Sequence, residues 1–577
     1  MVPITPICKL NARTAAGRAP SLAALVAVAL AALAPGAAAA RPAPVTASPL
    51  KAYARARLAG VDGDVAAASR SLAAVLAARP DDAAVAARAY RQALVAGDMA
   101  LALRSAALLD KGGALPADGR LLLMAQAVRN RDWAAAQAAV DAAADDGSFD
   151  FLAPVLSAWI ARGAGRDPFA ILDAPTGSAL TAALAAEHRA LLLIAAGRVD
   201  EGEGIARTQA LTGDGSGAFR LVAAARLQAA GRTQAALALL PGEDPVMVSA
   251  RAAIAAGRPL DMGSSGPAGG IAQLLLRVGE TVQADPRSPL ALTLARLAHF
   301  LDPASPAAAL TLARLLAVNG QRDAALAMLA PIVAAGAAAP LLAPAVDLKI
   351  AILAQSDRRD EALALAAERS RDPRAGIADH ARLGDLLVEL GREGEAVPAY
   401  RRAVTLAEAA AGSPAGERRW SLWLVLGSAL ERSGQWGEAR AALEKAVQLA
   451  PLEPAALNYL GYAQLERREN VKAAMTLIER AASLRPDDPA ITDSLGWAYF
   501  LIGDLAQAIP ALERAVEGEP ADPTINEHLG DAYWAAGRRF EARHAWRAAA
   551  LFADSPAVAE RATAKIDRGF SDALAAR

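Results

Sequence analysis

The side chains that could carry out chemistry are five histidines and many carboxylates, but their spacing gives no catalytic pattern. No two histidines stand three or four residues apart, so no helix turn offers a histidine pair to a metal ion. His528 and His544 fall in one C-terminal hairpin on opposite helices, and we expect them at packing or rim positions. The H-E-x-x-H, G-x-S-x-G and G-x-x-x-x-G-K-[ST] motifs do not occur. We therefore predict no catalytic residue, no metal site and no cofactor.

Two short segments resemble binding loops but lack what such loops need. Residues 213–217 (GDGSG) have no basic residue to hold a phosphate and no strand before them. Residues 62–64 (DGD) have neither the spacing nor the distal glutamate of a calcium loop. We interpret both segments as turns. The chain has 60 basic and 61 acidic residues, which argues against a general nucleic-acid binder, because that class carries an excess of positive charge.

The elements that would position any functional side chain are four copies of one pattern in residues 423–550. The Leu-Gly pair of each copy recurs in steps of 34, 35 and 34 residues, at Gly427, Gly461, Gly496 and Gly530. The proline that closes a copy recurs in steps of 35 and 34 residues, at Pro451, Pro486 and Pro520. A period of this length is typical of helical hairpins stacked into a solenoid.

The residue types of the third copy explain the pattern. Gly496 and Ala508 are small, which lets two helices approach closely. Gly503 can end the first helix with a positive φ, and Pro520 stops the second helix. The pattern resembles the tetratricopeptide repeat (TPR) family. That resemblance implies an all-α fold, a TPR-type α-solenoid in which antiparallel helical hairpins form a superhelix, in one or two segments.

The first forty residues predict an export signal. Basic residues precede an apolar core at residues 21–34, and alanines at 38–40 offer a cleavage site. The core is shorter than the roughly 20 residues that span a membrane. We predict a cleaved signal peptide and a periplasmic protein; an uncleaved helix that anchors the chain in the inner membrane is the alternative. Cleavage would remove Cys8, the only cysteine, and with it any disulfide or thiol chemistry.

Weaker copies of the turn signal recur before the strong array, for example at Gly63, Gly97 and Asn130. Residues 257–270 (GRPLDMGSSGPAGG) interrupt the repeat period, and we place there the junction between two solenoid segments. A long loop within one continuous superhelix is the alternative. The predicted organisation is a signal peptide (1–40), a linker (41–49), degenerate TPR-like helical repeats (50–256), a Gly/Pro-rich junction (257–270), further TPR-like repeats (271–378), a well-formed TPR array (379–555) and a capping helix (556–577).

The resemblance also implies where a partner would bind. In TPR proteins the first helix of each repeat lines a concave groove, and the matching positions here carry acidic, amide and aromatic groups. The predicted groove residues are Asn458, Tyr462, Asp493, Trp497, Phe500, Glu527, Asp531 and Trp534, with Ser428, Glu431 and Arg432 from the first copy. Such a groove favours a peptide or helix that carries basic or aromatic residues. For Trp497 and Phe500, packing between neighbouring repeats is the alternative.

The sequence therefore predicts a non-catalytic periplasmic scaffold or adaptor for protein–protein interaction. Exported bacterial TPR proteins, which it resembles, imply a role in cell-envelope assembly or export. The expected partners are proteins, with no nucleic acid and no membrane span after signal cleavage. The alternative is a regulatory or ligand-binding subunit of an envelope enzyme, with an unrecognised functional domain in the N-terminal half.

Overall fold

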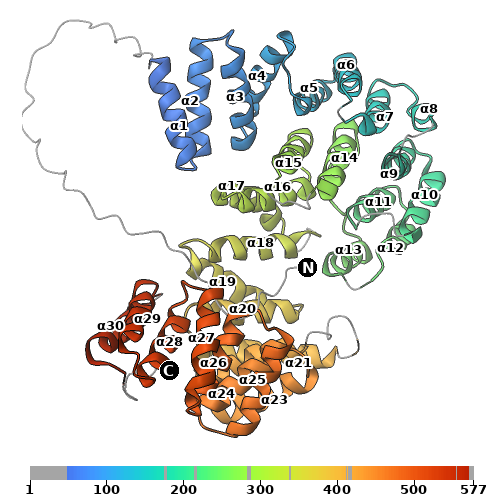
Figure 1. Cartoon of the computed structure of the whole chain (residues 1–577). Helices are drawn as coiled ribbons and strands as arrows, with labels where there is room; N and C mark the ends of the chain where they lie inside the picture. The colour runs from blue at the N-terminus through green and yellow to red at the C-terminus, as the bar shows by residue number, and fades with distance from the viewer. Residues whose placement is uncertain are drawn as a thin grey trace, which may run out of the picture. The chain divides into compact units, whose positions relative to one another are not determined.

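The computed structural model describes residues 48–570 except 148, 175–177, 213–216, 243, 283–287, 337–339, 411, 413–418 and 554. The predicted signal peptide, most of the predicted linker, residues 213–216 of the GDGSG segment and residues 571–577 lie outside the described residues. The described part contains 30 α-helices and no strand, which confirms the all-α prediction (Figure 1). Within it, no helix combines the length and the apolar character that crossing a membrane requires.

The chain divides into two compact units, one ending at Asp357 and the other beginning at Arg358. The helices of the first unit are α1 (Pro49–Val61), α2 (Val65–Ala78), α3 (Ala83–Ala96), α4 (Met99–Lys111), α5 (Ala117–Arg129), α6 (Trp133–Asp145), α7 (Ala153–Gly163), α8 (Phe169–Leu172), α9 (Ala179–Ala195), α10 (Val199–Thr212), α11 (Gly217–Ala229), α12 (Thr233–Ala238), α13 (Pro245–Ala255), α14 (Pro267–Val282), α15 (Pro289–Leu301), α16 (Pro306–Val318), α17 (Arg322–Ala334) and α18 (Leu342–Ala354). A short 3-10 helix, Asp150–Leu152, precedes α7.

The helices of this unit pack mainly as consecutive pairs, α1 with α2, α3 with α4 and α5 with α6 among them. The turn between α3 and α4 shows how the sequence makes a pair. Gly97 ends α3 with a φ of 80°, a conformation that glycine adopts without steric cost. Asp98 then begins α4, and its carboxylate accepts a hydrogen bond from the Leu101 N–H at 3.0 Å. The weak turn signals of the sequence therefore do mark helical hairpins.

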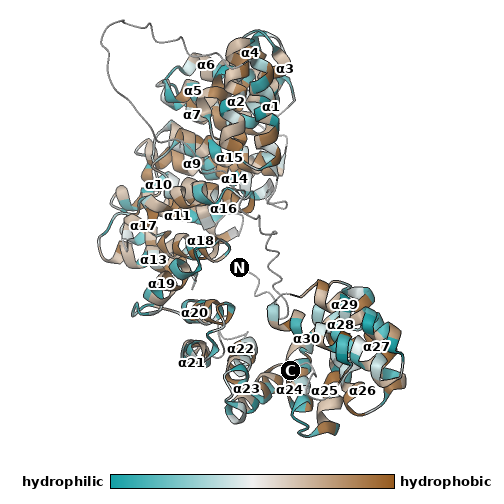
Figure 2. Ribbon diagram, turned by 90° about the vertical axis from the view of Figure 1, so that its left-hand side faces the viewer, coloured by the Kyte–Doolittle hydropathy of each residue, from teal (hydrophilic) through white to brown (hydrophobic). Residues whose placement is uncertain are grey.

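The helices α14 and α15 form an inner layer of the first unit. Figure 1 shows them inside the arc formed by α1–α13. There α14 contacts α5, α7 and α9, while α15 contacts α3 and α5. Most residues of α15 are buried, including Arg296 at 8% exposure. Both ribbons are largely hydrophobic in Figure 2, as expected for helices that are covered on more than one face.

The segment 257–270 lies inside the first unit and leads into this inner layer. Gly270 packs so closely on Trp159 that an added Cβ would collide with the indole ring. The Arg226 guanidinium donates hydrogen bonds to the carbonyl oxygens of Ser265 and Ser264, at 2.9 and 3.3 Å. The junction that we placed at 257–270 is therefore corrected: the glycines permit close packing within one unit, and the boundary between units follows Asp357.

The second unit contains the strong repeats. Its helices are α19 (Arg359–Ser370), α20 (Ile377–Glu389), α21 (Glu393–Ala409), α22 (Arg419–Arg432), α23 (Trp436–Leu449), α24 (Pro454–Glu466), α25 (Val471–Leu484), α26 (Pro489–Leu501), α27 (Leu505–Gly518), α28 (Pro523–Ala535), α29 (Arg539–Leu551) and α30 (Pro556–Arg568). Each first helix packs on the second helix of its own repeat, as α26 does on α27. An added Cβ at Gly496 would lie 2.7 Å from Leu512 Cγ, so this position requires a small residue.

Candidate partner-binding groove

The first helices of the four strong repeats, α22, α24, α26 and α28, form a continuous wall, because each contacts the first helix of the next repeat. Polar side chains connect these helices. The Tyr459 hydroxyl donates to Ser428 Oγ at 2.8 Å, and Asn458 Nδ2 donates to Ser494 Oγ at 3.1 Å. Trp497 Nε1 donates to Glu466 at 2.5 Å. Ser428, Asn458 and Trp497, which the repeat pattern assigns to the groove, therefore each bond to a side chain of a neighbouring first helix.

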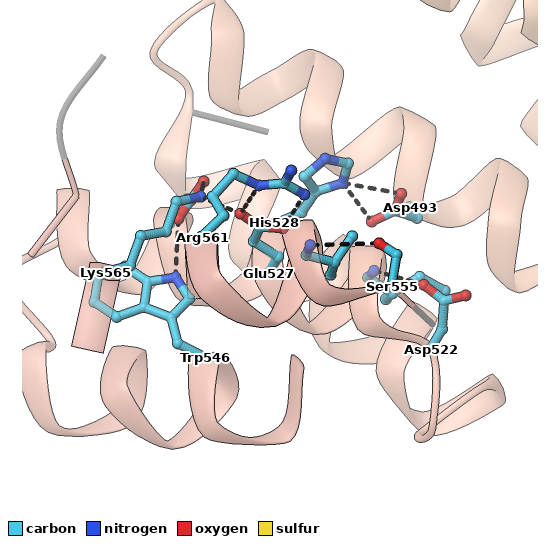
Figure 3. Close-up of polar contacts among 11 residues, drawn as sticks. Asp493, Asp522, Glu527, His528, Trp546, Ser555, Arg561 and Lys565 are labelled. Carbon is cyan, nitrogen blue, oxygen red and sulfur yellow. Dashed lines mark hydrogen bonds and ion pairs between the residues drawn. The ribbon is translucent and has the colours of Figure 1, made fainter. Parts of the chain in front are cut away.

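A charged cluster joins the last repeats to α30 (Figure 3). His528 Nδ1 lies 3.0 Å from both carboxylate oxygens of Asp493. Arg561 donates two hydrogen bonds of 2.8 Å to Glu527. The Lys565 ammonium lies 2.7 Å from Glu527 and 2.6 Å from Asp531.

Local capping positions α28 and α30, the two helices that carry all of this cluster except Asp493. Asp522 begins α28 by accepting the Ile525 N–H at 2.8 Å, and Ser555 begins α30 by accepting the Val558 N–H at 3.4 Å. Two of these ion pairs of α30, Arg561 with Glu527 and Lys565 with Asp531, join residues 34 positions apart, which is the repeat period. Because of this spacing, α30 occupies the place that the first helix of a further repeat would take.

The three acidic groove residues are placed on the wall as the pattern predicts, but they are not available to a partner. Asp493, Glu527 and Asp531 are 6%, 0% and 0% exposed, and each has a cationic partner within the chain. We expected their charge to attract a basic segment. That expectation is corrected, because His528, Arg561 and Lys565 already neutralise these carboxylates.

Burial and the ion pairs of the cluster shift the pKa values of its groups in opposite directions. Burial raises the pKa of Asp531 to about 6, although Lys565 and His528 favour its ionised form. Burial alone would lower the pKa of His528, but the charges of Asp493, Asp531 and Glu527 outweigh it and raise that pKa. The pKa of Glu527 lies below its ordinary value, since Arg561 and Lys565 outweigh the effect of its burial. The cluster therefore has its full set of ion pairs above the pKa of Asp531, about 6, and below the raised pKa of His528.

The aromatic groove residues divide into a buried one and three half-buried ones. Trp497 is 1% exposed, and its ring stacks on His528 with a centroid distance of 4.0 Å, so the packing alternative describes it. Tyr462, Phe500 and Trp534 are half-buried. Phe570 meets Phe500 edge to face at 6.0 Å, so the segment after α30 covers part of this wall.

An open position remains at Asn458. This side chain lines a small cleft of about 60 Å³ between α22, α24 and α26, together with Leu424, Ser428, Tyr459 and Ile491. Asn458 Oδ1 is buried and has no hydrogen-bond partner among the described residues. A buried acceptor without a donor is costly, so a ligand N–H in this cleft would be stabilised.

The sequence analysis missed the residues that complete the wall, namely Tyr459, Ser494, Arg561 and Lys565. A signal for the last two was present, because they follow Glu527 and Asp531 by one repeat period. The described residues contain no group of three or more His, Cys, Asp or Glu side chains arranged to hold a metal ion.

Comparisons with known proteins give matches among solved structures. The sequence has no match among curated proteins. The matching structures include a tetratricopeptide repeat protein from Parabacteroides merdae, with 14% identity over 44% of this chain and 95% of that chain and a TM-score of 0.38. A thermophilic TPR protein from Thermus thermophilus shows 21% identity over 33% and 98%, with a TM-score of 0.29. The Cut9–Hcn1 structure of the APC/C shows 14% identity over 91% and 97%, with a TM-score of 0.36.

Family models identify the repeats directly. A model described as tetratricopeptide repeat matches residues 424–489 and 494–558, and another with the same description matches residues 380–409. These matches cover the helical hairpins whose first helices form the wall. The second unit therefore contains tetratricopeptide repeats.

Proposed function

We propose that the chain is a non-catalytic scaffold that binds a partner peptide or helix on the wall formed by α22, α24, α26 and α28. TPR repeats support protein–protein interaction, and the observation that carries the proposal is the unpaired Asn458 Oδ1 in its cleft. A peptide laid along the wall would donate a backbone N–H to this oxygen. An apolar or aromatic side chain of the peptide would contact the half-buried Tyr462 and Phe500.

A photo-crosslinking amino acid placed at Asn458 tests this proposal in cells. Gln507 is the matched control, because it is exposed on α27, a second helix that lies outside the wall. We expect a crosslinked partner from position 458 and none from position 507. The affinity of that partner for purified protein should fall with Asn458→Ala and stay unchanged with Gln507→Ala. Equal crosslinking at both positions would place the partner site elsewhere.

The proposed location is the periplasm, and the proposed role is in cell-envelope assembly or export. The support is the basic start, the apolar core and the small-residue site of the first forty residues. N-terminal sequencing of protein from the soluble periplasmic fraction should begin at or near Arg41. An intact chain beginning at Met1 in the membrane fraction would instead support the inner-membrane anchor.

A further inference from the structure

A second cleft lies in the first unit, between its inner layer and the outer hairpins. Its wider part, about 900 Å³, is lined by Arg129, Arg131 and Arg162 near the ends of α5 and α7, and by the loop before α14. A narrower part of about 440 Å³ continues between the α3–α4 turn and the helices α15, α16 and α17. Arg129 and Pro303 line both parts, so the two form one cleft, which we term the seam.

The seam is positively charged. Of the residues that the structure describes, four arginines line it and no aspartate or glutamate does. The nearby carboxylates of Asp98, Asp132 and Asp302 each accept a backbone N–H. Arg131 forms no ion pair within the described part of the chain, and Arg129 stacks on Phe300 at 4.2 Å. An anionic group in the seam would therefore meet guanidinium groups with which no acidic side chain of the described residues forms an ion pair.

The narrower part of the seam is largely apolar. Leu312 and Leu316 form its floor, at 3% and 2% exposure. Met99, Phe300 and Met328 are half-buried at its edge. Methionine side chains adapt their shape to a ligand, so this part can take a bulky apolar side chain.

Two buried polar atoms of the seam lack partners. Arg296 is 8% exposed and donates to the Val95 carbonyl oxygen at 2.5 Å, yet its Nε has no acceptor among the described residues. His299 Nδ1 is also buried without a partner there. Both side chains line the narrower part, where a ligand oxygen could accept from the Arg296 Nε–H.

We propose that the seam binds an acidic peptide segment that carries a bulky apolar side chain. The carboxylates would pair with Arg129, Arg131 and Arg162, and the apolar side chain would enter the narrower part beside Met328. A free phosphate would fill only a small fraction of this volume and would leave the apolar part empty. The seam lies in the first unit, whereas the wall proposed to bind a partner lies in the second. This inference therefore goes beyond the proposed function and does not depend on it.

The test uses the full chain and fluorescence anisotropy. The probe is a short fluorescein-labelled peptide of glutamates with one central leucine. Comparison probes are the same peptide without the leucine, its lysine counterpart and a single-stranded DNA oligonucleotide. We expect the leucine-containing acidic peptide to bind most tightly and its affinity to fall as salt rises.

Charge-reversal variants localise the binding. Arg129→Glu and Arg131→Glu should each weaken the affinity by about tenfold or more, because repulsion replaces attraction. Arg104→Glu is the matched control, since Arg104 is exposed on α4 and does not line the seam. Arg131 is also exposed, so its variant should fold even if loss of the Phe300 contact affects the Arg129 variant.

Several results would overturn the proposal. Equal weakening by Arg104→Glu would mean that binding follows overall charge and not the seam. Equal affinities of the acidic peptides with and without the leucine would show that the narrower part of the seam does not bind the peptide. Tighter binding of DNA or of the lysine peptide would assign the seam to another class of ligand.

Discussion

Replacing Lys565 with methionine should destabilise the C-terminal end of the repeat array more than the same replacement of any exposed lysine. The side chain is fully buried and bridges two carboxylates, so Lys565→Met leaves the carboxylate of Asp531 without its cationic partner. Removing one partner of a buried pair costs about 3–5 kcal/mol. Arg561 still pairs with Glu527, so we expect the lower end, about 3 kcal/mol.

The loss of stability cannot exceed the free energy of protonating Asp531, because the variant can bury this carboxyl group in its neutral form. Neutralising a carboxyl group with an unfolded-state pKa of about 3.9 costs roughly 4 kcal/mol at pH 7 and roughly 1.5 kcal/mol at pH 5. The destabilisation by Lys565→Met should therefore shrink on acidification. The added change Asp531→Asn should recover part of the loss at pH 7, because an amide carries no charge to bury.

Hydrogen exchange with mass spectrometry measures the effect in the intact chain. A loss of about 3 kcal/mol should accelerate exchange of the protected amides of α28 and α30 by roughly a hundredfold. Lys472→Met is the control, because Lys472 is exposed on α25. The reasoning fails if α28 and α30 exchange no faster in Lys565→Met than in Lys472→Met, or if the loss is as large at pH 5 as at pH 7.

Two further substitutions test the packing and the titration of the array. Gly496→Leu should destabilise the second unit by roughly 1–3 kcal/mol, because Leu512 lies where the new side chain would begin; an unchanged thermal melting curve would contradict the assigned contact. The stability that His528 contributes is fully present below about pH 6.5 and is lost as pH rises through its raised folded-state pKa. His528→Gln should therefore flatten the decline in stability above about pH 6.5, as followed by chemical denaturation; an unchanged pH profile would count against the His528–Asp493 pair.

The repeat register could be predicted from the sequence because it depends on local rules. Small residues such as Gly496 and turn glycines such as Gly503 act within one hairpin, and the structure places both as expected. Exposure of a wall residue depends instead on the neighbouring repeat. Trp497 occupies a groove position by number, but His528 of the next repeat stacks on it and removes it from solvent.

The inner layer of the first unit could not be predicted from periodicity alone. The sequence of α15, PLALTLARLAHFL, carries apolar residues around most of its circumference. Such a helix must be covered on several sides, but the pattern does not say by which elements. The seam follows from that fold-back, so its arginines, which are far apart in sequence, gave no local signal.

The match between ion-pair spacing and repeat length restricts how this array can change size by duplication. A copy inserted upstream of α26 keeps every neighbour relation downstream, because the hairpins of the second unit pack mainly on adjacent ones. A copy added after α29 separates Arg561 and Lys565 from Glu527 and Asp531. Growth at that end is tolerated only if the new last hairpin brings its own two carboxylates, so internal duplication is the easier route to a longer array.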